Sequence, residues 1–195
     1  ALPPGHRPRH DSRQAYGLCL RRHGLLSPHN GCGIIGRRTC GQALAMNTAR
    51  YAFPTPAGKI CLRQEGGAIV ALDWGEGPES SPTPLLRQAR AEIDAYFAGE
   101  RQDFDLPLAP RGTEFQRRVW RELAAIPKGR VLTYRELAAR LASSPRAIGG
   151  ACGANPIPII IPCHRVLARN GLGGYSGAGG LATKTWLLAD RKSVV

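Results

Sequence analysis

The amino-acid sequence predicts an α+β protein, with a small N-terminal β-sheet domain followed by a mainly helical C-terminal domain that carries a helix-turn-helix. Three observations predict this fold class. Residues 51–74 contain segments rich in β-branched and aromatic residues, separated by glycine turns. A polar, proline-containing connector follows at residues 99–111. Beyond it, threonines stand three positions before Gln or Glu, which is the pattern of helix starts.

The first domain is expected to be a small antiparallel sheet with one helix. Residues 51–62 indicate a strand, a turn and a second strand, and Gly66-Gly67 marks another turn before a third strand at 68–74. Apolar residues then recur at helical spacing, after a start near Ser81-Pro82, at Leu85, Ala89, Ile93, Tyr96 and Phe97. This domain holds no residue pattern that indicates catalysis.

Domain boundaries are expected from the changes in composition. Residues 1–45 are rich in Arg, Gly, Pro and His and show no sustained period, and the only methionine is Met46. We therefore expect 1–45 to be a disordered or non-native extension, 46–108 an N-terminal domain with both helix and strands, and 109–195 a C-terminal domain.

Three helix starts are expected in the second domain. Thr113 with Gln116, and Thr133 with Glu136, form two capping boxes. Ser144 is suited to cap a third helix, with Pro145 in its first turn. Only a few residues join the second and third helices, which favours a helix-turn-helix.

The third of these helices is nearly bare. It reads Arg146-Ala-Ile-Gly-Gly-Ala-Cys-Gly-Ala154, and each interior glycine costs about 1 kcal/mol relative to alanine. Such a smooth helix suits the minor groove of DNA, with Arg146 projecting as a wedge. The alternative is close packing against a neighbouring helix.

The charge of the chain points to a polyanionic partner. The formal net charge is +13, and residues 109–195 carry +10 of it, whereas residues 46–108 carry −3. Concentrated positive charge is most often matched to nucleic acid, the alternative being a solvated basic face. No apolar run approaches the about 20 residues of a membrane span, so we expect a cytoplasmic, nucleoid-associated protein and no membrane partner.

The candidate reactive group is Cys163. The apolar run at 157–161 predicts a buried strand that ends at Pro162 and presents Cys163 beside His164. His164 is the only histidine outside the first 30 residues. A thiolate is a nucleophile and a neighbouring imidazole makes it accessible, although a structural cysteine is the alternative.

Neither a metal nor another cofactor is expected. The six cysteines include no CxxC pair. The spacing of the five cysteine and histidine candidates matches no compact zinc pattern. These candidates are Cys19, His23, His29, Cys32 and Cys40.

A glycine-rich loop follows the thiol. Six glycines surround Tyr175 and Ser176 between residues 169 and 180, so the backbone can approach a ligand closely there. A closing helix is expected from Leu181 to about Lys192. A thiol, a wedge arginine, a bare helix and a basic face together suggest a cysteine that acts on an extruded DNA base.

The motifs resemble those of the O6-alkylguanine-DNA alkyltransferases, or methylated-DNA–protein-cysteine methyltransferases. The likeness covers about residues 50–192 and is strongest from Gly112 onward. The motifs that carry it are Pro162-Cys163-His164-Arg165-Val166, Phe115-Gln116, Val119-Trp120, Thr133-Tyr134, Arg146-Ala147-Ile148-Gly149-Gly150 and Asn155-Pro156. This resemblance implies a ribonuclease-H-like N-terminal domain before the helical one, and it implies that residues 109–195 form the DNA-binding and alkyl-acceptor domain.

The resemblance also implies direct reversal of DNA damage. Cys163 would take the alkyl group of O6-alkylguanine, or of O4-alkylthymine, irreversibly and once, after base flipping in double-stranded DNA. His164 would draw the thiol proton through a water, and Asn155 would brace the turn. The implied DNA contacts are Tyr134, Arg146, Ala147, Gly149, Gly150 and Arg165, and the implied base pocket is Val166, Tyr175 and Ser176. We expect a monomer.

One departure keeps a second hypothesis open. The family usually has a glutamate that orients the histidine, and here that position is Arg191, after Asp190. A cation there predicts a less activated thiol. The alternative function is a damage sensor of the alkyltransferase-like type, which flips the base without repairing it. Cys163 speaks against it, because those proteins carry tryptophan at this position.

Two further classes fit less well. A regulator reading the major groove needs side chains that the bare helix lacks. A cysteine hydrolase needs a direct dyad and an oxyanion hole, whereas adjacent residues of an extended segment point to opposite sides.

Overall fold

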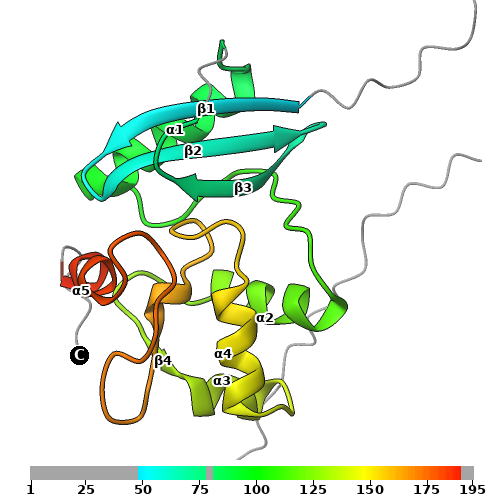
Figure 1. The fold of residues 1–195 in the computed structure, drawn as a ribbon, viewed down its shortest axis with the longest axis vertical. Coiled ribbons are helices and arrows are strands. Elements are labelled where there is room, and N and C mark those ends of the chain that lie inside the picture. Colours follow the sequence, from blue (N-terminus) through cyan, green and yellow to red (C-terminus); the bar gives the residue numbers. More distant parts are fainter. Residues whose placement is uncertain (1–47, 78–80, 190–195) are drawn as a thin grey trace, which may run out of the picture. The chain divides into compact units, whose positions relative to one another are not determined.

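The described part of the chain begins with three antiparallel strands, in the order β1-β2-β3 (Figure 1). The computed structural model describes residues 48–77 and 81–189, so the expectations for residues 1–45 and Met46 lie outside it. The strands are β1 (Thr48–Thr55), β2 (Gly58–Glu65) and β3 (Ala68–Trp74). Gly58 and Gly66, at the turns between them, have positive φ angles of 115° and 57°, a backbone region that glycine occupies without strain.

Helix α1 (Pro84–Ala98) packs on one face of this sheet (Figure 1). Its cap is Thr83 rather than Ser81-Pro82, because the Thr83 hydroxyl accepts a hydrogen bond from the Leu86 N–H at 3.2 Å. The helix ends at Gly99, which is left-handed with φ 82°. Its buried face consists of Leu86, Ala89, Glu92, Ile93 and Tyr96.

The helical part follows the connector and begins at the expected caps. The helices are α2 (Glu114–Ala124), α3 (Tyr134–Arg140) and α4 (Pro145–Gly153). Both capping boxes are confirmed, and Ser144 caps α4 through the Ala147 N–H. Because α3 and α4 pack together across a short turn, the helix-turn-helix is confirmed as well.

The segment before Cys163 is not a strand, although it is buried as expected. Residues 157–161 form turns, and the isoleucines among them are at most 6% exposed. Two features prevent an extended ladder. Pro158 and Pro162 lack N–H donors, and Ile159 has a positive φ of 72°. The prediction of a core strand was therefore wrong, because a uniformly apolar run has no period that separates a strand from a buried loop.

The remaining elements enclose the thiol. Cys163–Arg165 form a 3-10 turn, η1, and β5 (Val166–Leu167) pairs in parallel with β4 (Leu132–Thr133). Helix α5 spans Leu181–Ala189 within the described range. No described helix is long and apolar enough to cross a membrane.

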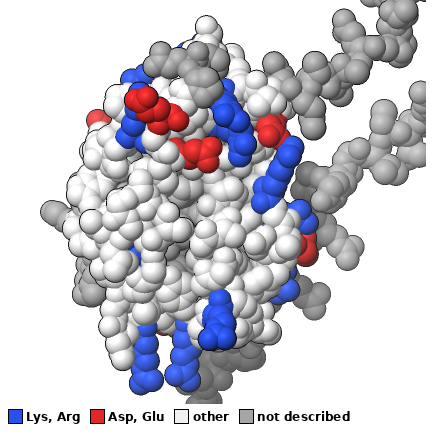
Figure 2. Space-filling model, viewed as in Figure 1, with Lys and Arg blue, Asp and Glu red and all other residues white. Residues whose placement is uncertain are grey.

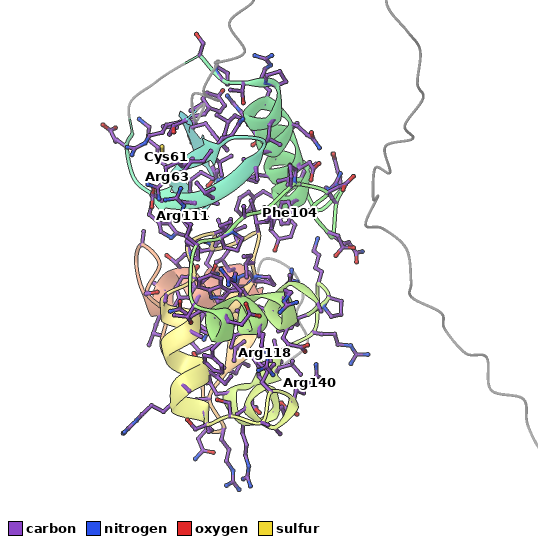
Figure 3. All side chains as sticks on the ribbon, turned by 90° about the vertical axis from the view of Figure 1, so that its right-hand side faces the viewer. Cys61, Arg63, Phe104, Arg111, Arg118 and Arg140 are labelled. Atoms are coloured by element: carbon purple, nitrogen blue, oxygen red, sulfur yellow. The ribbon has the colours of Figure 1, made fainter. Side chains whose placement is uncertain are left out.

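A shared core joins the sheet to the helices. One cluster of buried residues includes Ile60 and Leu72 of the sheet, Trp120 of α2 and Ile161 of the turn segment. The Leu72 N–H also donates to the Pro156 carbonyl at 2.8 Å. Figure 3 shows Cys61 and Arg63 on the sheet, and Arg118 and Arg140 among the helices. The sheet is thus connected directly to the segment that leads to Cys163.

Candidate active site and nucleic-acid interface

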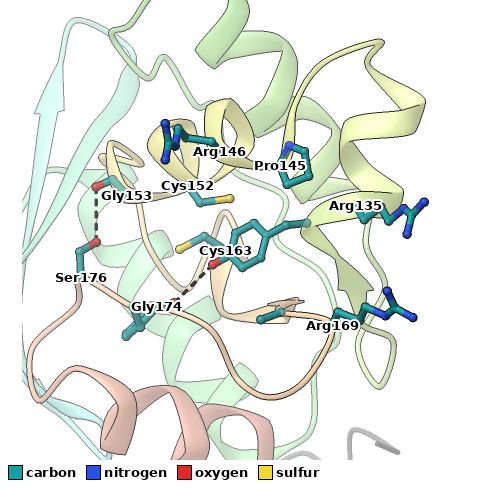
Figure 4. A pocket seen from close by; sticks show the side chains of 13 residues that line it. Arg135, Pro145, Arg146, Cys152, Gly153, Cys163, Arg169, Gly174 and Ser176 are labelled. Carbon is teal, nitrogen blue, oxygen red and sulfur yellow. Dashed lines mark hydrogen bonds between the residues drawn. The ribbon is translucent and has the colours of Figure 1, made fainter.

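A cavity of about 780 Å³ opens at the helix-turn-helix, with Cys163 in its wall (Figure 4). Helices α3 and α4, the turn η1 and the loop after β5 all contribute to it. The lining residues are Tyr134, Arg135, Pro145, Arg146, Gly149, Cys152, Gly153, Cys163, Ala168, Arg169, Gly174, Tyr175 and Ser176. The structure therefore brings Cys163 together with Tyr134, Arg146, Tyr175 and Ser176, which the sequence had singled out separately.

The Cys163 thiol lies in a mostly apolar setting with a few groups that favour its charge. It is 7% exposed. Burial raises the pKa of this thiol, whereas a hydrogen bond from Asn155, the charge of Lys184 and nearby backbone N–H groups lower it. The site thus protects the thiol from solvent and offsets part of the cost of ionising it.

Asn155 holds the turn that carries the thiol. Its Nδ2 donates to the Ile161 carbonyl at 2.8 Å, and its Oδ1 accepts from the Ile157 N–H at 3.1 Å. One side chain therefore ties both ends of the buried loop, as an Asx-type turn does. Because an amide nitrogen has two donors, the same group can also serve the Cys163 sulfur.

Lys184 is a site residue that the sequence analysis missed. It is fully buried on α5, and its Nζ donates to the Val166 carbonyl at 2.7 Å and the Gly174 carbonyl at 3.1 Å. Burial lowers its pKa, and the charges of Cys163 and Cys152 act in the opposite direction. A signal was present, since Lys184 stands three and four residues before the buried Leu187 and Leu188, on the face of the helix that packs inward.

Two tyrosines face the cavity with protonated hydroxyls. Burial raises the pKa of Tyr134 to about 12, and its hydroxyl donates to the Gly174 carbonyl at 3.4 Å. Burial and the negative charge of Cys163 raise the pKa of Tyr175. The buried Tyr175 hydroxyl has no hydrogen-bond partner among the described residues. Since unpaired buried polar groups are costly, this hydroxyl is a candidate ligand contact.

The bare face of α4 is open. A Cβ added at Gly149, Gly150 or Gly153 would meet no atom within 4 Å in the described part of the chain. The alternative explanation, close packing of these glycines against a neighbouring helix, is therefore wrong. Arg146 and Ala147 are exposed on the same helix. A smooth, open surface beside the cavity is what close approach of another backbone requires.

Two arginines that the sequence analysis did not select complete the rim. Arg135 on α3 and Arg169 in the loop after β5 line the cavity and point outward in the same direction (Figure 4). Lys and Arg side chains gather at the end of the molecule where α3 and α4 lie (Figure 2). The mouth of the cavity is thus basic.

Two family models match the chain over nearly all of its described length. Residues 49–110 match the ribonuclease-like domain, and residues 114–192 the DNA-binding domain, of 6-O-methylguanine DNA methyltransferase. The chain belongs to the 6-O-methylguanine DNA methyltransferase family. The fold class inferred from the sequence is thereby confirmed.

Curated relatives and solved structures agree with this family. A methylated-DNA–protein-cysteine methyltransferase of Methanosarcina acetivorans is 41% identical over 147 residues, which cover 70% of this chain and 93% of that protein. One of Mycobacterium bovis is 48% identical over 149 residues, covering 71% and 89%. The crystal structure of Mycobacterium tuberculosis OGT in complex with DNA is 40% identical, with a TM-score of 0.66, and covers 74% of this chain and 92% of that one.

Arg165 of this methyltransferase does not lie where the sequence analysis expected it. The sequence analysis expected it to contact DNA, but it is 5% exposed. Its guanidinium donates to the Ile126 carbonyl at 2.5 Å and to the Tyr96 hydroxyl at 3.1 Å. The structure contradicts a DNA contact, because a buried guanidinium whose donors face protein acceptors has no access to phosphate.

Other expected residues of this methyltransferase lie beside the cavity rather than in it. His164 is 1% exposed, and Val166 is fully buried with its carbonyl bonded to Lys184. Neither is among the lining residues, and Ala147 and Gly150 face solvent on α4. Asp190 and Arg191 lie outside the described residues. No cluster of described residues could hold a metal ion.

Proposed function

We propose that this protein repairs alkylated double-stranded DNA by transferring the alkyl group of a flipped O6-alkylguanine, or O4-alkylthymine, to Cys163, once and irreversibly. One observation carries the proposal. A free thiol lies in the wall of a cavity of about 780 Å³, which has room for a base, and the mouth of the cavity is formed by an open glycine helix and arginines. The cavity is lined by residues of a single chain, so the proposed reaction needs no second subunit.

Binding begins at the basic mouth. Arg135 and Arg169 contact phosphates, and the open face of α4 approaches the minor groove. Arg146, exposed in the first turn of α4, enters the space that the flipped nucleotide leaves. Tyr134, the first residue of α3, contacts the adjacent phosphate and turns it outward.

The transfer is a displacement at the alkyl carbon. The Cys163 sulfur attacks this carbon, so that an S–C bond forms while the bond between carbon and O6 breaks. The thiol proton leaves through His164 and a water, and guanine regains a proton at a ring nitrogen. The unpartnered Tyr175 hydroxyl and Ser176 contact the base edge. Because the thioether is stable, each molecule reacts once.

The rim arginines give a prediction for DNA binding. Replacing Arg135 or Arg169 by glutamine should weaken binding to any duplex and reduce the salt slope of log K by about 1 for each. The control is Arg87→Gln, which removes an exposed charge on α1. Fluorescence anisotropy at several salt concentrations measures the slopes. Equal slopes in all three variants would contradict phosphate contacts at the rim.

The direct test is intact-protein mass spectrometry. After incubation with a duplex that carries one O6-methylguanine, the protein should gain one methyl in place of one hydrogen, stoichiometrically. Cys163→Ser and an undamaged duplex are the controls, and neither should give the gain. Tight, selective binding of the damaged duplex without a mass gain would replace this proposal with the damage-sensor function.

A further inference from the structure

A second thiol, that of Cys152, faces the same space as Cys163. Both residues line the cavity of about 780 Å³, and both also line an adjoining cavity of about 250 Å³. Figure 4 shows the two side chains entering the cavity from different elements, Cys152 from α4 and Cys163 from η1. Both are free, and each is 7% exposed. The transfer chemistry requires only one thiol, so the second has no assigned role.

The position of Cys152 keeps its thiol directed inward. It lies in the last turn of α4, where the Trp120 Nε1 donates to the carbonyl of the preceding Ala151 at 2.8 Å. Gly150 lies two positions before it and Gly153 one position after it, and a Cβ at either would meet no described atom within 4 Å outside the neighbouring backbone of the helix. The turn is therefore anchored on its buried side and has room to adjust on its open side.

The two thiols are electrostatically unequal. Burial raises the pKa of Cys163, but a hydrogen bond from Asn155, the charge of Lys184 and nearby backbone N–H groups oppose that rise. Burial and the negative charge of Cys163 raise the pKa of Cys152 to about 12, and only the charge of Lys184 opposes that rise. Since the thiolate is the reactive form and more groups stabilise it at Cys163, an oxidant in the cavity should react first with Cys163. Once Cys163 is neutral, the charge that opposes ionisation of Cys152 disappears, while Lys184 still favours it.

We propose that Cys152 is a resolving thiol that forms a reversible disulfide with Cys163 under peroxide. The disulfide proposal rests on the proposed function, because both require Cys163 to be the reactive thiol of the site. In the first step the Cys163 thiolate attacks the peroxide, giving a sulfenic acid and hydroxide. In the second, the Cys152 sulfur attacks that sulfur and water leaves. Hydrogen peroxide is the oxidant, and both thiols are oxidised as it is reduced.

The bridge has two consequences for repair. It occupies the attacking sulfur and links two walls of the cavity, so alkyl transfer stops. It also removes the sulfenic acid before further peroxide converts it to sulfinic acid, a product that thiol reductants do not reverse. Oxidised protein should therefore regain activity when it is reduced.

The experiment compares the full-length protein with Cys152→Ser and with Cys61→Ser, whose thiol lies on the sheet (Figure 3). Each protein is treated with hydrogen peroxide, then divided between buffer and dithiothreitol. Methyl transfer from an O6-methylguanine duplex is measured against the untreated sample of the same variant. Peptide mass spectrometry after non-reducing digestion identifies any bridge among all six cysteines.

The expected result is a Cys152–Cys163 peptide lighter by two hydrogens in the wild-type protein and in Cys61→Ser. Transfer should fall at least about tenfold and return with dithiothreitol, whereas in Cys152→Ser it should fall without returning. A bridge to another cysteine, or none, would overturn the proposal even if Cys152→Ser fails to fold. Absence of transfer before any peroxide treatment would refute the proposed function instead, and the peptide result would still decide the bridge.

Discussion

Replacing Lys184 by methionine should slow alkyl transfer about ten- to hundredfold at neutral pH, because the lost positive charge no longer favours the thiolate and each loss of about 1.4 kcal/mol lowers the rate about tenfold. Lys184 is the buried cation of the site and lowers the pKa of Cys163. Without it the Cys163 pKa rises, so fewer molecules carry the thiolate. The deficit should be largest at neutral pH and shrink as the pH rises toward the new pKa.

Single-turnover rates measured between about pH 6 and pH 10 test this predicted pH dependence of the rate deficit. The matched control is Lys184→Arg, which keeps the charge and changes the geometry of the donors to Val166 and Gly174. An equal slowing in Lys184→Arg and Lys184→Met would show that Lys184 only supports the loop and does not act on the thiol through its charge. Thermal unfolding of each variant separates lost stability from lost activation.

Arg165→Ala should lower the free energy of unfolding by about 2–4 kcal/mol, because it leaves buried acceptors without donors. The acceptors are the Ile126 carbonyl and the Tyr96 hydroxyl, which lie in other elements. DNA binding by the folded variant should keep the wild-type salt slope, since the guanidinium is buried.

Urea unfolding and salt-dependent anisotropy measure the two quantities. Tyr96→Phe is the matched control, because it removes one hydrogen-bond partner and should cost about 1 kcal/mol. If Arg165→Ala reduced the salt slope by about 1 with little loss of stability, Arg165 would be a DNA contact after all.

The starts of helices α2 and α3 could be predicted because they depend on residues that are close together in the sequence. Thr113 and Thr133 cap their helices through residues three positions away, and hydrogen bonds of that span can be read from the sequence. The glycines of α4 also predicted a feature of the structure, because a helix without side chains on one face has a smooth surface there. Their open face in the structure agrees with the interpretation of a close approach.

Signals of longer range were not available from the sequence. The path of residues 157–161 depends on Asn155 and two prolines acting together, and an all-apolar run does not reveal it. Arg165 looked like a DNA contact because of its residue type, whereas its partner Tyr96 lies 69 positions away. Lys184 is a different case, because its spacing from Leu187 and Leu188 indicated the buried face of the helix, and the sequence analysis considered only those two leucines.

The link between strand β3 and the turn before Cys163 has a consequence for how the protein can be divided. All residues that line the large cavity lie between 134 and 176, so a fragment that begins at residue 109 would contain every one of them. That fragment would nevertheless lack Leu72, whose N–H holds Pro156, and Tyr96, whose hydroxyl holds Arg165. Through these hydrogen bonds, the sheet and α1 help to fix the conformation of the turn that carries Cys163. Changes in the interior of the sheet should therefore alter the repair rate although they touch neither DNA nor the lesion.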